Sequence, residues 1–476
     1  MVIKSAMNRW DWIVLLLAAG VVVFQCFWPP VVGIANNGDF PKIAGRLDVG
    51  NPSDIQDVTR FIRVKYVVDP KYRWDSRFYS SELLLFAAAF GLSSIFGNPA
   101  VFDMRLMGVV HAAIFLLAFY LLLPLLRSFT LASRAIVLVL ILCVFTDVMY
   151  ISYFNTLYMD TAALLFLLLA VVSFLRALRW QKAADRWLFV VAAVLLITSK
   201  TQHYPLGVPV AVLLAWSGGL LVQGRGRLFR TLSVIVVTAA TAFSDLRETP
   251  TFYPAMGAYT VIFSELLPKS KDISGDLQQL GLDDSYRRYI GTNAYSSDAG
   301  FRAPEFQEAF SQRPFYAYLA WFLLRHPSRA LDVTVARLDR AGLQRPYLGN
   351  FERTAGFPEY ARSRAFAAWS GLKAALFGLH GGRYLIYSFG LVIAVVANAI
   401  ARRQTLPAGI PAAICALGAM TLLELLVASF ADALDPERHY SLFSALTDLL
   451  VICGVCLVVV ALRARPPVQL THGVLR

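Results

Sequence analysis

The sequence predicts an all-α polytopic membrane protein with about ten transmembrane helices. Of its 476 residues, 57% are hydrophobic, and apolar runs of about 20 residues, the length that crosses a bilayer as a helix, recur along the chain. The second observation is charge placement. Lys and Arg, which give a net charge of +13, concentrate in short loops between alternate apolar runs, as is typical of cytoplasmic loops. The excess of positive charge therefore reflects which loops face the cytoplasm. Membrane lipids are expected partners, and nucleic acid is not.

The first apolar run, at about residues 12–34, predicts the first span. Lys4 and Arg9 precede it, and positive charge before a first span favours a cytoplasmic amino terminus. The chain then emerges into a first outer loop, residues 35–103, which is rich in polar and charged side chains. This loop is too long for a simple connection between two helices.

Residues 81–97, within that loop, are apolar but short and interrupted. This pattern favours a helix at the membrane interface over a full span. Charge supports the choice: with residues 104–126 as the second span, Arg127 and Arg134 become cytoplasmic, whereas a span at 81–97 would place them outside.

The other spans divide the chain into three parts. Residues 1–246 form a transmembrane module of seven helices, residues 247–380 an outer helical segment, and residues 381–476 the last three helices, with both termini cytoplasmic. Within the outer segment, the apolar stretch 315–324 is too short to cross a bilayer and predicts an interfacial helix. The spans after the second are expected at about 135–152, 161–178, 187–200, 205–222, 231–246, from near 381 to before Arg402, 405–430 and 441–462.

Polar side chains gather at the expected outer ends of the helices, although they come from distant parts of the chain. Ionisable groups are costly at mid-bilayer, so this placement indicates a functional site at the outer face. The candidates are Asn37, Asp39, Glu82, Tyr153, Asn155, Tyr158, Asp160, Lys200, Gln202, His203, Arg438 and His439.

Three candidate carboxylates each have two interpretations. Asp39 lies where an outward helix meets water and can accept a proton from an attacking hydroxyl, or it can belong to a turn in which Asn37 caps backbone groups. Glu82 either binds a metal or substrate or stabilises a helix amino terminus. Asp160 either takes part in the site or caps the next helix.

The cationic candidates lie where the positive-inside rule does not favour them. Lys200, His203, Arg438 and His439 can hold a phosphate, because Arg and Lys stabilise the negative charge that develops on a phosphate leaving group. The alternative is interaction with lipid headgroups. His111, inside the second span, is interpreted as structural.

The clusters also resemble a known group of enzymes. A carboxylate just after helix 1, interfacial helices and a second Asp after helix 3 resemble the GT-C type of membrane glycosyltransferase, in particular bacterial hexose transferases of glycan biosynthesis of the S-layer glycan type. The matching stretches are Asn37-Gly38-Asp39-Phe40, residues 153–158, Asp276-Leu277 with Leu280-Gly281-Leu282, residues 291–295, His326-Pro327, residues 345–350, Trp369-Ser370 with Lys373, and Glu437-Arg438-His439.

The resemblance implies a GT-C-like fold, a polyprenyl-phosphate-linked hexose as donor, and a glycan or lipid-linked acceptor. It also implies Asp39 as general base, a bacterial inner membrane, and an active site on the periplasmic or extracellular side. One departure concerns the position after Tyr158. Gly-Glu or Ser-Glu is expected there, whereas this chain has Met159-Asp160, so the role carried onto Asp160 is open.

The mechanism expected from these residues is a single inverting displacement. Asp39 takes the acceptor proton while Lys200, Arg438 and His439 hold the lipid phosphate. No covalent intermediate is required. The sequence identifies no cofactor, and a divalent ion near Asp39, Glu82 or Asp160 is left open, because no ligand spacing identifies a metal.

Other functions fit the same composition. A polysaccharide polymerase or ligase would depend on outer arginines and a histidine instead of Asp39. A transporter of lipid-linked glycans would need polar groups along a path through the bilayer, for which the sequence offers only His111, Asp147 and Glu424. A structural subunit is a further alternative.

Overall fold

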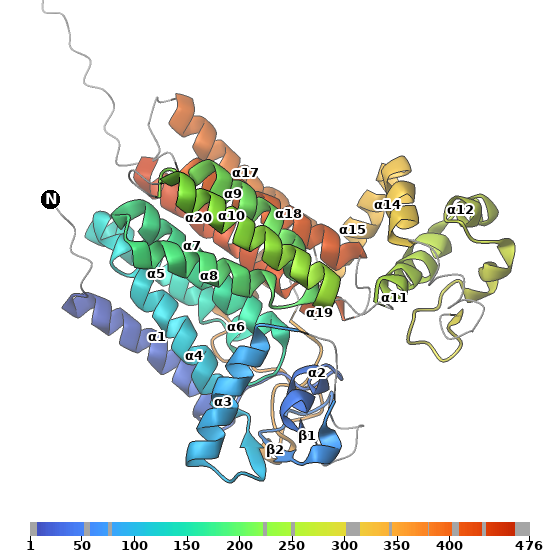
Figure 1. The fold of residues 1–476 in the computed structure, drawn as a ribbon, viewed down its shortest axis with the longest axis horizontal. Helices are drawn as coiled ribbons and strands as arrows, with labels where there is room; N and C mark the ends of the chain where they lie inside the picture. The colour runs from blue at the N-terminus through green and yellow to red at the C-terminus, as the bar shows by residue number, and fades with distance from the viewer. Residues whose placement is uncertain are drawn as a thin grey trace, which may run out of the picture.

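The computed structural model describes most of the chain as a slanted helical bundle with two additions at one end (Figure 1). The described residues are 7–51, 58–74, 79–221, 226–248, 253–300, 315–341, 345–378, 380–401, 409–430 and 435–461.

Ten helices of the bundle occupy the ten positions predicted for spans. Seven of them are long and apolar enough to cross a membrane, which confirms a mostly helical, multi-pass membrane protein. Helices α5, α8 and α9, with 15, 15 and 11 residues, fill the remaining positions. The ten are α1 (Arg9–Phe27), α4 (Arg105–Leu122), α5 (Leu131–Phe145), α7 (Met159–Trp180), α8 (Ala183–Ile197), α9 (Gly207–Ser217), α10 (Gly226–Phe243), α17 (Gly381–Ala401), α18 (Gly409–Phe430) and α20 (Ser441–Ala461).

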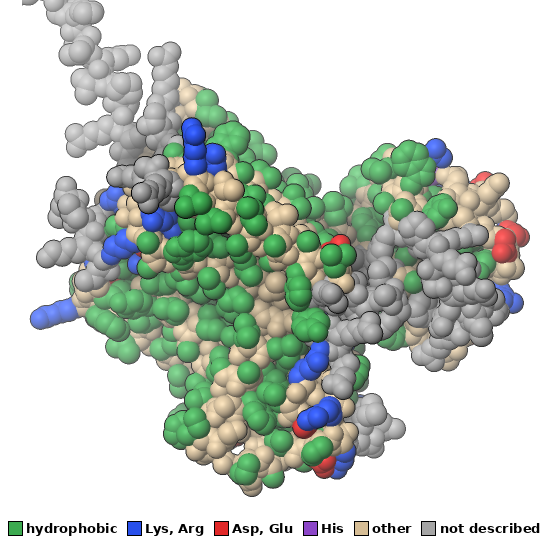
Figure 2. Space-filling model, in the orientation of Figure 1, with side chains coloured by type: hydrophobic (Ala, Val, Ile, Leu, Met, Phe, Trp, Pro, Cys, Tyr) green, Lys and Arg blue, Asp and Glu red, His purple; other side chains and the backbone are tan. Residues whose placement is uncertain are grey.

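Helix α7 is the central element of the bundle. It packs against α4 and α8, and 83% of its most apolar window is buried, against 28% for α1 and 22% for the span at α10. The outer helices instead expose large apolar side chains such as Leu16 and Ile393, and apolar side chains cover much of the bundle surface in Figure 2. Such a surface suits contact with lipid tails.

Two predicted spans end earlier than expected. The first span was predicted to reach residue 34, but α1 ends at Phe27, because Pro29 and Pro30 follow and cannot continue a helix. The span predicted at 135–152 is also divided. Helix α5 ends at Phe145, and the side chain of Asp147 then accepts the amide of Met149 to cap a short helix, α6 (Val148–Ile151).

The first outer loop folds into a small layer below the bundle. The predicted helix at 81–97 is present as α3 (Glu82–Phe96), and a short helix, α2 (Pro41–Ala44), follows α1. Three short antiparallel strands join them in the order β1 (Val49–Gly50), β2 (Lys65–Val68) and β3 (Val101–Asp103). The sequence did not predict this sheet, since two- to four-residue strands leave no readable alternation.

The described residues of the predicted outer segment, 247–380, lie in three places, one of which is the bundle itself, where residues 368–377 pack as a helix. Helices α11 (Tyr253–Thr260), α12 (Ile273–Gln279), α14 (Phe315–Arg325) and α15 (Pro327–Ala341) form a lobe beside the bundle with its own apolar core (Figure 1). Helix α14 is the one predicted at 315–324. Residues 345–367 pack instead on the first outer loop, where the amide of Ala35 donates to the carbonyl of Gly349 at 2.9 Å.

Positive charge collects at the end of the bundle where α1 begins. Asp11 there forms ion pairs with Arg127 and Arg134, and Arg176 pairs with Asp185 at 2.7 Å between α7 and α8. Lys and Arg side chains gather at this end in Figure 2. The loop after α1, the start of α7 and α19 (Pro436–His439) lie at the opposite end.

Inside the bundle, a buried carboxylate fixes α20 to its neighbours. Asp448 is fully buried and accepts hydrogen bonds from Tyr150 at 2.6 Å, Tyr384 at 2.6 Å and Trp369 at 2.8 Å. Lys373, on α16 (Ala368–Phe377), lies 3.1 Å from both of its oxygens. A buried charge is tolerated when a counter-charge and hydrogen bonds compensate its lost hydration.

Removal of Lys373 should therefore destabilise the protein. Lys373→Met leaves Asp448 without a counter-charge, and breaking a buried pair costs about 3–5 kcal/mol. Thermal unfolding in nanodiscs should show a clearly lowered Tm. Restoration of most of the Tm in Lys373→Met with Asp448→Asn would attribute the loss to the uncompensated charge, whereas equal Tm values for wild type and the single variant would contradict the account.

Candidate functional site

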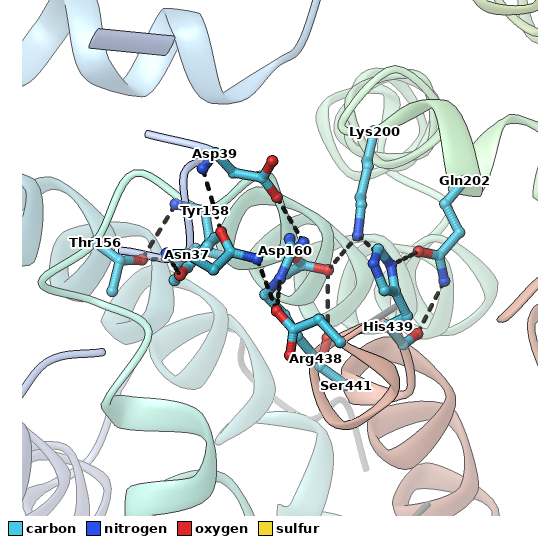
Figure 3. Close-up of polar contacts among 12 residues, drawn as sticks. Asn37, Asp39, Thr156, Tyr158, Asp160, Lys200, Gln202, Arg438, His439 and Ser441 are labelled. Carbon is cyan, nitrogen blue, oxygen red and sulfur yellow. Dashed lines mark hydrogen bonds and ion pairs between the residues drawn. The ribbon is translucent and has the colours of Figure 1, made fainter. Parts of the chain in front are cut away.

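The candidate site is organised around the guanidinium of Arg438 on α19 (Figure 3). Its side chain is 3% exposed, and each of its three nitrogens contacts a different carboxylate. Nη2 lies 2.5 Å from Asp39, Nη1 lies 3.0 Å from Asp160, and Nε lies 3.0 Å from Asp435. One buried cation thus joins the loop after α1, the start of α7 and the start of α19.

A polar turn positions Asp39. The side chain of Asn36 accepts the amides of Gly38 at 2.8 Å and Phe40 at 3.1 Å, and that of Asn37 accepts the amide of Asp39 at 3.2 Å. Gly38 has φ +104°, a conformation that glycine adopts without strain. The turn that the sequence offered as one interpretation of Asp39 is present, and it directs the carboxylate toward Arg438.

Asp160 is the buried carboxylate of the site. It belongs to the first turn of α7, where a negative charge interacts favourably with the helix amino terminus. Its side chain is 1% exposed and lies 3.0 Å from both Lys200 and Arg438, with the hydroxyl of Ser441 at 3.5 Å. Asp39, by contrast, is 16% exposed, so it is the more accessible of the two.

A chain of hydrogen bonds continues from Lys200 into the bundle. Nζ of Lys200 and Oε1 of Gln202 lie 3.0 Å and 2.9 Å from Nδ1 of His439. The amide nitrogen of Gln202 donates to Glu424 on α18 and to the carbonyl of His439. Nδ1 of His203 lies 3.1 Å from Glu424. These predicted residues therefore lie together.

The charges around Asp39 determine its protonation state. Burial alone would raise the pKa of this carboxyl, but the positive charges of Arg438, Lys42 and Lys200 outweigh burial and hold the pKa well below its usual value. Lys42 contributes through an ion pair of 2.5 Å. Asp39 is consequently ionised at neutral pH, the state that a general base requires.

Two predicted tyrosines line the cluster. The guanidinium of Arg438 lies over the ring of Tyr158, 4.9 Å from its centre, a cation–π contact. The hydroxyl of Tyr158 donates to the carbonyl of Ala35 at 2.7 Å and accepts the amide of Asn37 at 2.9 Å. Tyr153 is buried edge-on against Tyr158, with ring centres 6.2 Å apart. Burial raises the pKa of Tyr158.

Two other predicted residues have partners outside the Arg438 cluster. Glu82 is fully buried, 2.9 Å from Nε2 of His111, and accepts the amide of Ala162 at 3.1 Å. This contact agrees with the structural interpretation of His111. Asn155 donates to the carbonyls of Cys26 at 2.9 Å and Val32 at 2.8 Å, which fixes the chain where it leaves α1.

The structure adds residues that the sequence did not single out as site residues. Lys42 pairs with Asp39, and Asp435 accepts from Asn37 at 2.7 Å and from Arg438. Glu424 was noticed only as an isolated polar residue within an apolar run. The signal for Asp435 was its position beside Arg438, but its contact with Asn37 spans 398 residues and leaves no local pattern.

Metal-ligand geometry is absent from the part of the chain that the structure describes: no group of three or more His, Cys, Asp or Glu side chains could hold a metal ion there. The carboxylates of Asp39, Asp160 and Asp435 are instead all bound by Arg438.

Comparison with known families identifies the chain. The family described as the YfdI N-terminal transmembrane domain matches residues 2–469. The chain belongs to this family. The finer resemblance to hexose transferases of the S-layer glycan type stays a prediction. No curated protein matches the chain.

Three solved structures, all of an oligosaccharyltransferase from Archaeoglobus fulgidus, are similar to this YfdI-family chain. One is AglB with an inhibitory peptide and a dolichol-phosphate, with 14% identity, a TM-score of 0.42, and coverage of 94% of this chain and 50% of that one. The apo form has a TM-score of 0.41 at 14% identity, with coverage of 95% and 51%. The chain thus spans about half the length of these proteins.

The depressed pKa of Asp39 predicts how stability depends on pH. An ion pair of this kind stabilises the fold at pH values above the unfolded pKa of about 3.9, and the contribution is lost as pH falls toward the lower folded pKa. The Tm of Asp39→Asn should therefore lie furthest below the wild-type Tm near neutral pH. Thermal unfolding between pH 7 and 3 tests this. A Tm difference between wild type and Asp39→Asn that does not narrow below about pH 4 would contradict the lowered pKa of Asp39.

Proposed function

We propose that this protein is a membrane glycosyltransferase of the GT-C type. It transfers a hexose from a polyprenyl-phosphate-linked sugar to a glycan or lipid-linked acceptor at the periplasmic face of a bacterial inner membrane. The observation that carries the proposal is the pairing of an accessible carboxylate, Asp39, with buried cations at one end of a multi-pass bundle. Lys and Arg gather at the opposite end, which supports a cytoplasmic location for that end.

Asp39 is the general base of the proposed reaction. It is ionised and 16% exposed, so an acceptor hydroxyl can approach it. Each carboxylate oxygen has two lone pairs, so Asp39 can accept a further hydrogen bond while it contacts Lys42 and Arg438. The hydroxyl oxygen attacks the anomeric carbon, the bond to the lipid phosphate breaks, and the hydroxyl proton passes to Asp39.

Buried cations stabilise the leaving phosphate in this proposal. Arg438 and Lys200 are 3% and 7% exposed, and charge interactions are stronger where water is excluded. Asp160 contacts both cations at 3.0 Å and so fixes their positions relative to each other. His439 lies against Lys200, with its Nδ1 3.0 Å from Nζ of that lysine.

The polar groups within the bundle do not favour a transport path. Among the described residues, Asp147 is bound by Ser370 at 2.9 Å, Glu424 by Gln202 and His203, and Asp448 by Lys373. Each therefore has a fixed partner that accounts for its burial.

Replacement of the base should abolish transfer. Asp39→Asn keeps the shape of the side chain but cannot accept the hydroxyl proton, and loss of a general base typically costs about 10²–10⁴-fold in rate. The measurement is release of labelled sugar from polyprenyl-phosphate-hexose by purified protein in nanodiscs, over a panel of sugars and acceptors.

The matched control for this experiment is Asp48→Asn, which removes a partly exposed carboxylate that pairs with Arg73 in the same outer loop. Its turnover should equal that of wild type. Wild-type turnover in Asp39→Asn would overturn the role of Asp39, and no donor use by any of the three proteins would overturn the proposed function.

A further inference from the structure

The charges of the Arg438 cluster are already balanced without a substrate. Asp39, Asp160 and Asp435 are negative, while Arg438, Lys200 and Lys42 are positive and pair with them. All three nitrogens of the guanidinium are occupied by carboxylates. A phosphate that entered this cluster would add negative charge beside three carboxylates that already contact Arg438, which favours the departure of one of them.

The three carboxylates differ in how firmly they are held. Asp160 is 1% exposed and is bound by Lys200 and Ser441 as well as by Arg438. Asp39 has Lys42 as a second cation and a turn that fixes its backbone. Asp435 has Arg438 as its one cationic partner among the described residues, and its Oδ1 is buried without a hydrogen-bond partner there.

The backbone of Asp435 also favours movement of this carboxylate over the other two. Its φ and ψ of 53° and 51° lie in the left-handed region, which is sparsely populated for residues with a side chain, although Asp and Asn tolerate it better than most. Asp435 immediately precedes Pro436 at the start of α19. A change in its own torsions can thus turn the carboxylate away without unwinding a long helix.

The atoms that hold Asp435 form a small anion site. Nδ2 of Asn37 and Nε of Arg438 converge on a single oxygen, Oδ2, from 2.7 and 3.0 Å. Asn37 is held in this orientation because its own oxygen accepts the amide of Asp39. Departure of Asp435 would leave two fixed donors and a net positive charge beside the base.

We infer that Asp435 occupies the position of the donor phosphate and leaves it when the lipid-linked donor binds. A phosphate oxygen then takes the hydrogen bonds that Asn37 and Arg438 now donate to Oδ2. The inference rests on the proposed function and adds to it a defined phosphate position with its own internal competitor. It also explains how the protein keeps Arg438 buried and compensated between turnovers.

Direct binding tests the inference without knowledge of the sugar or acceptor. The probe is polyprenyl monophosphate, which presents the phosphate shared by all such donors, titrated into protein in phosphatidylcholine nanodiscs. Asp435→Asn and Asp435→Gly remove the competing charge, and Asn and Gly both accept left-handed backbone. Each variant should bind the probe about tenfold or more tightly than wild type, because a like charge within a few ångströms is removed.

Glu437→Gln is the matched control. Glu437 lies two residues further along on α19, and within the described residues its side chain forms no ion pair or hydrogen bond with Arg438 or Asn37. Its affinity should stay near that of wild type. Wild-type binding with equal or weaker binding by both Asp435 variants would overturn the inference alone, whereas absence of binding in all four proteins would overturn it together with the proposed donor class.

Discussion

The arrangement of the site depends on one buried guanidinium. Arg438 is 3% exposed, and a charge so removed from water is stable only with compensating partners. The protein supplies them from the loop after α1, from α7 and from its own helix. These segments lie far apart in the sequence, so the interaction ties the first, middle and last parts of the bundle together at one end. Stability and site geometry therefore have a common origin.

Helix α20 connects this end to the interior. It begins at Ser441, immediately after the α19 residues that hold the cluster, and Asp448 fixes it two turns further on through Lys373, Tyr150 and Tyr384. An apolar helix between apolar neighbours has little that fixes its rotation or its depth. Directional hydrogen bonds fix both the rotation and the depth of α20. This suits a helix that directly follows the segment in which Arg438 lies within 3.0 Å of its partners.

The sequence predicted a mostly helical, multi-pass fold well, because run length and loop charge report directly on the bilayer. It also predicted that Asp39, Asp160, Lys200 and Arg438 would meet, since ionisable groups at helix ends collect on one face. It did not predict the role of Asp435 or the small sheet. Contacts between residues hundreds of positions apart, and strands of two to four residues, leave no periodic signal in the sequence. The early end of α1 was readable from Pro29 and Pro30 but was outweighed by the apolar residues that follow.

A cluster with balanced charge constrains the order of events at the site. Asp39 is the accessible carboxylate, whereas Asp160, Arg438 and Lys200 lie behind it. Under the proposed reaction, an acceptor that approached first would meet an ionised base whose cations are fully engaged. A donor that approached first would replace one carboxylate of the cluster with its phosphate. The buried cations would then stay paired with negative charge. Since unpaired charge in a buried site is costly, entry of the donor before the acceptor is the sequence of binding that the cluster favours.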